Sequence, residues 1–329
     1  MIFEEKNKPE NNWPEQTRQL LEKQKTSWKL CRNNYEALGR IQTRKYEFEN
    51  FDIKIQLNPE RITSSSADVG APAIKLRKCF LCLENLPKEQ ECLVYNKNFV
   101  ILSNPYPIFQ EHFTISKKHH LPQTIIGNFE ELLDITHALG KFYTVFYNGP
   151  KCGSSAPDHM HFQAVTKNEI PVEYEFCMMI EKLGPMVLRN GKIDVRFFED
   201  HLRYFISFES QYKGELLFAF KTFVKAFKKI SLLNEEPLMN IIATFHERSW
   251  RLIIFPRLKH RPHQFYADDE SKLLISPAAV DMGGLLIIPR KEDFEKIKSE
   301  DIISIYKQVT LPKEYFEYLR KKIGEIFTK

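Results

Sequence analysis

Two histidines and a glutamine are spaced so that they could share one face of a β-strand. They are His159, His161 and Gln163, in the segment Ala-Pro-Asp-His-Met-His-Phe-Gln-Ala-Val. Side chains alternate between the two faces of a strand, so all three would project to the same side. A neutral imidazole can attack phosphorus and carry the transferred group covalently, while an amide can hold phosphate oxygens. The pattern therefore predicts phosphorus chemistry here; the plainer alternative is a histidine pair on a surface strand.

A turn-forming stretch before this strand offers further polar groups. Gly153, Ser154 and Ser155 lie shortly ahead of His159. Hydroxyl groups and backbone amides can bind phosphate oxygens, so these residues are candidates for substrate contacts. Asn148 is a further candidate, for a ribose or phosphate contact, and its alternative is a turn position in Asn-Gly-Pro.

A Cys-x-x-Cys pair, Cys79 and Cys82, could form half of a metal site. A structural zinc ion needs four nitrogen or sulfur ligands in a tetrahedron. His120 and His159 could complete the set, with His119 as the alternative to His120. We therefore predict a structural Zn²⁺ here. The other interpretations are two thiols without a metal, or a redox pair, although no thioredoxin-like pattern surrounds the motif.

Basic residues in two segments are candidates for binding phosphate. Arg257 and Lys259 follow directly on an apolar stretch, and Arg61 and Arg77 precede the cysteine pair. Arginine and lysine are the side chains best suited to bind phosphate oxygens. The alternative is a set of solvated loops. Arg251, in the apolar stretch before Arg257, is included as a further substrate-binding candidate.

The composition is that of an ordinary globular protein. The chain has 329 residues, of which 43% are hydrophobic and 28% are charged, with a net charge of +5. This length allows one large or two ordinary domains, and the mild charge does not favour nucleic-acid binding. The polar first residues lack a signal-peptide core, no apolar run approaches ~18 residues, and the six cysteines are not a dense disulfide pattern. We expect a cytoplasmic protein without a membrane segment.

The hydrophobic pattern predicts alternating helices and strands. We expect an N-terminal helical segment over 1–43, a first unit over 44–190 and a second unit over 191–329. Expected helices are 15–38, 128–147, 211–230 and 299–328, the last broken near Pro312, and 61–77 is expected to be a loop. Expected strands are 44–57, 99–103, 112–116, 159–165, 193–208, 239–245, 250–256, 271–275 and 285–289.

A weak internal repeat links the two units. Residues 159–167 resemble 249–257, and residues 111–118 resemble 283–290. In this alignment Arg251 stands where His161 stands in the first unit. The repeat favours a duplicated α+β unit whose second copy lacks the nucleophile.

Taken together, these motifs resemble the transferase branch of the histidine-triad superfamily. Members of this branch carry His-x-His-x-Gln, whereas the hydrolase branch usually has a third histidine in place of the glutamine. Residues 153–163 resemble galactose-1-phosphate uridylyltransferase, diadenosine tetraphosphate phosphorylase and GDP-hexose phosphorylase. The segment 112–120, His-Phe-Thr-Ile-Ser-Lys-Lys-His-His, and the cysteine pair resemble further motifs of the group. The likeness covers residues 79–165 well and the second half more loosely, and implies two HIT-like units of antiparallel sheet flanked by helices.

The resemblance also implies roles for individual residues. His161 would be the nucleophile, His159 a zinc ligand, and Gln163 the residue that holds the phosphate of a nucleotidyl intermediate. Ser154 or Ser155 would contact substrate phosphate. Two departures stand out: the gap from serine to histidine is longer than in the uridylyltransferases, and the spacing from the cysteines to residues 119–120 is shorter, which leaves the third zinc ligand open.

We therefore expect a nucleotidyltransferase or phosphorylase that acts through a covalent nucleotidyl-histidine intermediate. Its substrate would be a nucleotide sugar or a dinucleoside polyphosphate, and its acceptor phosphate or a sugar phosphate. The alternatives are a non-catalytic nucleotide-binding protein, a HIT-type nucleotide hydrolase and an RNA-binding module, the last with only thin basic and aromatic support in residues 250–266. A monomer or a homodimer would fit a duplicated chain.

Overall fold

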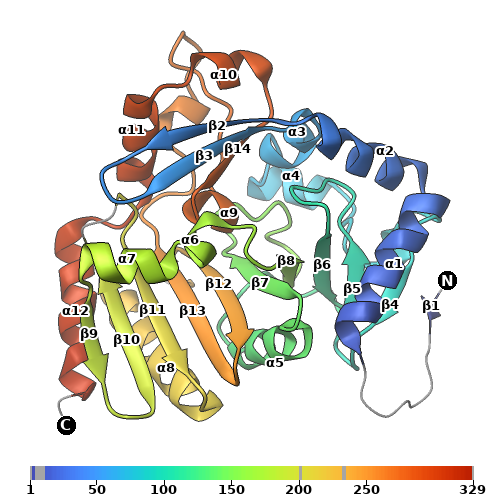
Figure 1. The fold of residues 1–329 in the computed structure, drawn as a ribbon. Coiled ribbons are helices and arrows are strands. Elements are labelled where there is room, and N and C mark those ends of the chain that lie inside the picture. Colours follow the sequence, from blue (N-terminus) through green and yellow to red (C-terminus); the bar gives the residue numbers. More distant parts are fainter. Residues whose placement is uncertain (1, 4–11, 200–201, 232–234, 328–329) are drawn as a thin grey trace.

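An eleven-stranded sheet forms the centre of the molecule (Figure 1). The structure is a computed structural model that describes residues 2–3, 12–199, 202–231 and 235–327. Neighbouring strands are antiparallel except β1 and β4. In spatial order the strands are β1 (Ile2–Phe3), β4 (Cys92–Val94), β5 (Phe99–Ser103), β6 (His112–Lys117), β8 (His161–Thr166), β7 (Tyr143–Asn148), β12 (Met239–His246), β13 (Ser249–Pro256), β11 (Phe205–Ser210), β10 (Ile193–Phe198) and β9 (Met186–Arg189).

A second sheet, of three strands, pairs segments from the first and last quarters of the sequence. Its strands, in order, are β14 (Leu285–Ile288), β3 (Asp52–Leu57) and β2 (Gln42–Glu47). The pairing of β14 with β3 is parallel. This small sheet lies over the central sheet, together with α9 (Ala279–Met282), α10 (Lys291–Lys296) and α11 (Ser299–Val309).

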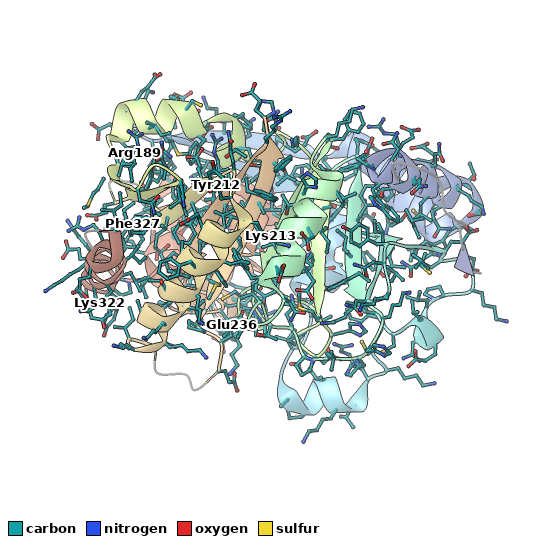
Figure 2. The ribbon with its side chains drawn as sticks, turned by 90° about the horizontal axis from the view of Figure 1, so that it is seen from below. Arg189, Tyr212, Lys213, Glu236, Lys322 and Phe327 are labelled. Atoms are coloured by element: carbon teal, nitrogen blue, oxygen red, sulfur yellow. The ribbon has the colours of Figure 1, made fainter. Side chains whose placement is uncertain are left out.

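Long helices cover the opposite face of the central sheet. They are α1 (Trp13–Ser27), α5 (Phe129–Leu139), α8 (Lys213–Lys228) and α12 (Lys313–Phe327), and their apolar sides share one core with the sheet. Figure 2 shows α8 beside α12, with Tyr212 and Lys213 at the start of α8 and Lys322 on α12. The shorter helices are α2 (Lys29–Ala37), α3 (Ile62–Ser65), α4 (Ala71–Leu76), α6 (Pro171–Tyr174) and α7 (Phe176–Leu183).

The side chains of β8 alternate between the two faces of the central sheet, and this alternation determines the face on which His161 and Gln163 lie. Phe162 and Ala164 pack into the core under the long helices, whereas Val165 packs into the core under the small sheet. His161 and Gln163 share the side of Val165. We call this side of the central sheet the site face.

The order of strands confirms a duplicated α+β fold. The central pair is β7 and β12, with β8, β6 and β5 following on one side and β13, β11 and β10 on the other. The predicted match of 159–167 with 249–257 therefore agrees with the topology. The match of 111–118 with 283–290 is wrong, because β11 takes the place equivalent to β6 while β14 pairs with β3 in the small sheet.

Several predicted elements are wrong in detail. The expected strands 44–57 and 193–208 each correspond to two paired strands, β2 with β3 and β10 with β11. A bend at Glu49 and Asn50 interrupts the alternating pattern of the first pair. The expected helix 128–147 ends at Leu139, and β7 follows; all six residues of β7 are buried, which gives an apolar run without strand alternation. Residues 271–275 form no strand, and 61–77 hold two short helices.

The other long helical predictions agree with the structure, although a break at Trp28 divides the first of them into two helices. In the part of the chain that the structure describes, no helix has the length and apolar character needed to cross a bilayer. The central sheet continues across the predicted boundary at 190–191, and α1 packs on β5.

Candidate active site and metal centre

A cavity of about 360 Å³ lies between the site face and the small sheet, and we call it the main cavity. Its volume is in the range that suits a small-molecule ligand. Its lining combines apolar side chains, among them Trp28 and Phe80, with a set of polar residues that we call the polar wall. The polar wall contains Arg61, Asn104, Thr114, Asn148, Gly153, Ser155, His161, Gln163 and Asp281.

The His161 ring borders the main cavity in a single tautomer. Its Nδ1 lies 2.8 Å from the carbonyl oxygen of His159, which can only accept a hydrogen bond, so Nδ1 carries the proton. Burial lowers the pKa of His161 to about 4, and the ring is therefore neutral near pH 7. This leaves a lone pair on Nε2, the nitrogen that a nucleophilic imidazole uses.

The side chain of Gln123 fixes the backbone of His161. Its Nε2 donates to the carbonyl oxygens of Asn148 and His161, at 2.9 and 3.0 Å, and its Oε1 accepts from the His161 N–H at 2.8 Å. The ladder between β7 and β8 ends at the pair Phe146–Gln163, so the glutamine amide takes over where the strands separate. This role of Gln123 was not predicted, because no local pattern around the residue indicates it.

His112 orients Gln163 from the neighbouring strand β6. The N–H of Ile108 donates to His112 Nδ1 at 3.2 Å, and His112 Nε2 lies 2.8 Å from Gln163 Oε1. Because Nδ1 accepts, Nε2 carries the proton and donates it to Gln163. Burial, with a contribution from Arg61, lowers the pKa of His112 to about 3. The Gln163 Nε2 group is thus left to donate to a ligand. This role of His112 was not predicted; the signal for it is the alternation of polar residues in the segment His-Phe-Thr-Ile-Ser, residues 112–116.

Arg61 supplies a cation to the polar wall. Its Nη1 donates to the carbonyl oxygen of Tyr106 at 2.6 Å, and its Nε has no hydrogen-bond partner within the described residues. Burial lowers its pKa to about 10, so it remains charged near pH 7. Asp281 lies in the same cavity, where burial raises the pKa of its carboxyl to about 6; its two oxygens accept the backbone N–H groups of Ala278 and Ile287. An anionic ligand would satisfy Arg61.

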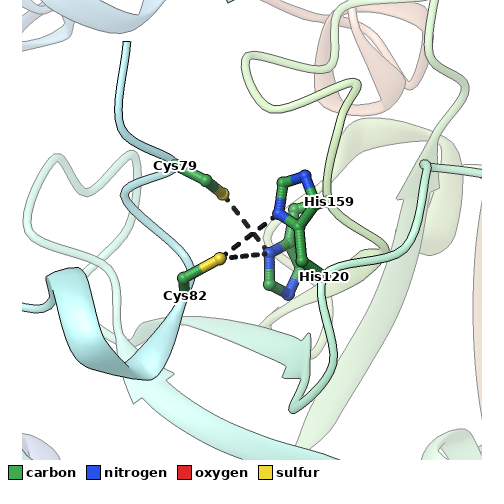
Figure 3. A group of neighbouring side chains, drawn as sticks. All are labelled: Cys79, Cys82, His120 and His159. Carbon is green, nitrogen blue, oxygen red and sulfur yellow. Dashed lines mark hydrogen bonds between the residues drawn. The ribbon is translucent and has the colours of Figure 1, made fainter.

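Four predicted metal ligands come together beside the main cavity (Figure 3). The sulfur atoms of Cys79 and Cys82 and one nitrogen from each of His120 and His159 all lie within 4.8 Å of one another. The Nδ1 atom of His159 is 3.3 Å from Cys79 Sγ, and that of His120 is 3.2 Å from Cys82 Sγ. Two ligands on a tetrahedral zinc ion would be about 3.4–3.8 Å apart. The donor set and its spacing fit Zn²⁺; His119 is exposed and outside this group.

His159 connects the metal centre to the His161 ring. Its Nε2 lies 2.7 Å from the Lys117 carbonyl oxygen, so Nε2 carries the proton and Nδ1 is free to bind a metal. Burial lowers the pKa of His159, which keeps the ring neutral. The carbonyl oxygen of the same residue accepts the Nδ1 proton of His161. A metal held here would therefore fix the residue that sets the tautomer of His161.

Comparisons with known proteins agree with this geometry. Residues 20–166 match the model of a domain of unknown function, DUF4922, and residues 217–329 match the model described as GDPGP1-like, C-terminal domain. By sequence, no curated protein matches the chain. The yeast Ap4A phosphorylase Apa2 in complex with Ap4A matches with a TM-score of 0.61 and 13% identity, over 90% of this chain and 98% of that chain. The same enzyme with AMP matches with a TM-score of 0.60 and 15% identity, over 90% and 96%.

The chain has the Ap4A phosphorylase fold. This fold agrees with the resemblance to the transferase branch of the histidine-triad superfamily that the sequence motifs indicate. Within this phosphorylase fold, Gly153 lies where a φ of +87° and the nearby Ala278 exclude a larger residue, because an added Cβ would be 2.5 Å from the Ala278 Cβ. Ser155 also lines the main cavity, whereas Ser154 is buried and is not part of its wall. The Oδ1 atom of Asn148 accepts from Asn240 and from the Ala279 N–H.

The remaining basic candidates lie away from the wall of the main cavity. Arg77 pairs with Asp158 and stacks over Phe80. Arg257 is fully buried and donates to the oxygens of Val309, Asn240, Pro277, Lys259 and His260, so its donors join loops of the protein. Lys259 is exposed, and Arg251 lies at a different cavity in the second half.

Proposed function

We propose that the chain is a nucleotidyltransferase or phosphorylase that forms a covalent bond between His161 and the nucleotidyl group of its substrate. The observation that carries the proposal is the His161 ring, which borders the main cavity with Nδ1 held by a carbonyl and Nε2 left with its lone pair. The phosphorylase fold, shared over 90% of the chain, supports the same reaction class.

In the first step, His161 Nε2 attacks the α-phosphorus of a nucleoside diphosphate-linked substrate. The P–N bond forms as the bond from phosphorus to the bridging oxygen breaks, and the leaving phosphate takes the electron pair. No proton needs to leave His161, because Nδ1 keeps its proton and the carbonyl of His159 accepts it throughout. Gln163 Nε2 and Arg61 are placed to stabilise the charge on the phosphoryl oxygens.

In the second step, an oxygen of inorganic phosphate attacks the same phosphorus. The P–N bond breaks and returns its electron pair to Nε2, which releases a nucleoside diphosphate and restores the histidine. A sugar phosphate could replace inorganic phosphate as the acceptor. Zinc bound by Cys79, Cys82, His120 and His159 would be structural and would hold His159 in place.

The charge of the main cavity favours a substrate with a short phosphate chain. Arg61 is the one cation among the described residues that line it, and Asp281 adds no positive charge. A diphosphate linkage, as in a nucleotide sugar, needs less compensation than the four phosphates of a dinucleoside tetraphosphate. We therefore place nucleotide sugars ahead of dinucleoside tetraphosphates as substrates of this chain.

The decisive experiment traps the intermediate. The purified protein is incubated with α-labelled nucleotide sugars and Ap4A, and label that is acid-labile but base-stable is counted on wild type, on His161→Ala and on the control His119→Ala. Wild type and the control should carry label and His161→Ala should carry none. Label on none of the proteins from any donor, or equal label on all three, would contradict the proposal.

The same samples separate the alternatives. A nucleotide hydrolase would form nucleoside monophosphate whether or not inorganic phosphate is present, whereas the proposed enzyme needs the acceptor for its second step. A non-catalytic binding protein would gain thermal stability from a nucleotide without turning it over. A cytoplasmic location and a monomeric or homodimeric state stay predictions.

A further inference from the structure

A second cavity, of about 180 Å³, lies on the site face in the other half of the sheet. The main cavity is located where β8 begins and β7 ends; the second cavity is located where β13 begins and β12 ends. Since the strand order repeats from one half to the other, the two cavities are at equivalent positions. Its wall includes Lys167, Glu173, Ile242, Thr244, Arg251 and Ile253.

Hydrogen-bond donors gather at this cavity. Arg251 uses Nε and Nη2 on one oxygen of Glu209, each at 2.9 Å, while its Nη1 has no partner in the described part of the chain. The guanidinium lies 4.0 Å from the centre of the Phe176 ring, which holds it in place. Thr244 is directly opposite Arg251 across the β12–β13 pair, so the hydroxyl and the guanidinium are neighbours.

A second cation reaches the same end of the two strands. Lys167 Nζ donates to the carbonyl oxygen of Phe245 at 2.5 Å, next in the chain to Thr244. An ammonium group has three donors, and the remaining ones are available to a ligand. Ile242 and Ile253, paired across the strands, form an apolar floor.

Glu173 completes the wall without excluding an anion. Its Oε2 accepts from Thr144 Oγ1 at 2.5 Å and from the Asn168 N–H at 3.2 Å, while its Oε1 is buried and has no hydrogen bond to any described residue. Burial raises the pKa of this carboxyl to about 7. The group is thus partly neutral near pH 7, and the wall carries two cationic side chains, Lys167 and Arg251, the second of them paired with Glu209.

We propose that the second cavity binds a small tetrahedral oxyanion, such as inorganic phosphate, through Arg251, Lys167 and Thr244. Arg251 and Lys167 are cationic and can only donate hydrogen bonds, and the Thr244 hydroxyl can donate one more, so the side chains favour a ligand that is rich in acceptors and negatively charged. The volume lies below that of cavities that hold drug-sized ligands, which restricts the ligand to an ion or a very small molecule. This site does not depend on the reaction proposed for His161.

The first test locates the anion directly. Crystals of the full chain are soaked in tungstate, a heavy tetrahedral oxyanion, and its anomalous signal is mapped. The expected peak lies between Arg251, Lys167 and Thr244, whatever is found in the main cavity. A map with no peak at the second cavity, at tungstate concentrations that occupy other sites, would overturn the proposal.

The second test measures affinity in solution. Inorganic phosphate is titrated calorimetrically into wild type, Arg251→Leu, Thr244→Val and the control Arg189→Leu, an exposed arginine on β9 (Figure 2). Arg251→Leu should weaken one binding event at least tenfold and Thr244→Val about threefold, with Arg189→Leu unchanged. Thr244→Val keeps the side-chain shape, so it tests the site even if Arg251→Leu does not fold. Identical titrations of wild type and Thr244→Val, with no tungstate peak, would rule the site out.

Discussion

The two halves of the central sheet repeat one order of strands but close their equivalent hairpins differently. In the second half, β12 and β13 stay paired up to His246–Ser249, and a two-residue turn joins them. Both turn residues, Glu247 and Arg248, have positive φ, of 48° and 65°, as expected for a tight hairpin. In the first half, the ladder between β7 and β8 stops at Phe146–Gln163, and residues 149–160 form a long loop.

The difference between the two connections determines which side chains come together in the first half. The long loop brings Gly153 and Ser155 to the main cavity and His159 to the metal centre. The parted strands admit the Gln123 amide, which holds the backbone of His161. In the second half the equivalent strand presents Arg251, which is paired with an acid. The half that carries the proposed nucleophile therefore differs from its copy in the length of this loop and in the side chains that the equivalent strand presents.

The comparison of the two halves is tested most strongly by removing the two side chains at equivalent positions, His161 and Arg251, one at a time. His161→Ala should lower turnover by roughly 10⁴-fold or more, because it removes the atom that bonds to phosphorus. Arg251→Ala should change turnover less than about twofold. Steady-state assays with the substrate identified by the trapping experiment give both values. A comparable loss in the two variants would mean that both halves take part in the reaction.

Loss of the metal ligands should be the next largest effect. Cys79→Ser should release about one zinc ion per chain, measured by elemental analysis, and lower the melting temperature by about 10 °C, since a structural zinc site contributes directly to folding. Cys177 is exposed and outside the cluster, so Cys177→Ser should change neither value. A zinc-free wild-type protein with normal stability would contradict the metal centre.

Removal of the Gln123 side chain, which links the backbones of Asn148 and His161, should have an intermediate effect. Gln123→Ala leaves three buried backbone groups without their partners, and we expect a loss of about 2–3 kcal/mol in the free energy of unfolding. The kcat should fall about 10–100-fold with little change in KM, since His161 shifts while the walls of the cavity remain. The control is Gln19→Ala, on the exposed side of α1. Unchanged stability and kcat in Gln123→Ala would show that the strands separate without the amide.

The smallest expected effect depends on pH and concerns Glu173 in the second half. The folded state binds its proton more tightly than the unfolded state, because burial raises its pKa from 4.5 to about 7. The stability from this proton is complete below pH 4.5 and is lost as the pH rises through 7. Glu173→Gln should therefore be more stable than wild type at pH 8, by about 2 kcal/mol, and equal at pH 4.5. Urea unfolding at both pH values measures this, and an equal difference at both would exclude the linkage.

The sequence predicted those parts of the site that depend on local spacing. Strand alternation predicted a common face for His159, His161 and Gln163, which holds for His161 and Gln163, whereas His159 lies before β8 begins and joins the metal cluster. The cluster of Cys79, Cys82, His120 and His159 was proposed from ligand types that the fold does bring together. Two contacts were not predicted: Gln123 with the backbone of His161, and His112 with Gln163. They join residues that are 38 and 51 positions apart in the sequence. The alternating pattern of residues 112–116 places His112 on one face of a strand but does not show its partner, and no local pattern marks Gln123.

Repeated α+β units could be predicted from the sequence. The prediction failed for elements whose conformation depends on contacts with the rest of the chain. The strand β7 was assigned to a helix because burial on both faces removes its alternation. Arg257 was taken as a substrate contact from its charge, whereas carbonyl oxygens of the folded loops use its donors. The burial of a charge depends on partners from the whole chain, which a sequence stretch does not show.

The parallel pairing of β14 with β3 has a consequence for biosynthesis. Leu285 lies opposite Lys54 in this pair and Ile287 lines the main cavity, so one wall of this cavity is completed only after a strand far along the chain has been synthesised. During synthesis, the site face around His161 would stay exposed to solvent and to chaperones until Ile288 has left the ribosome.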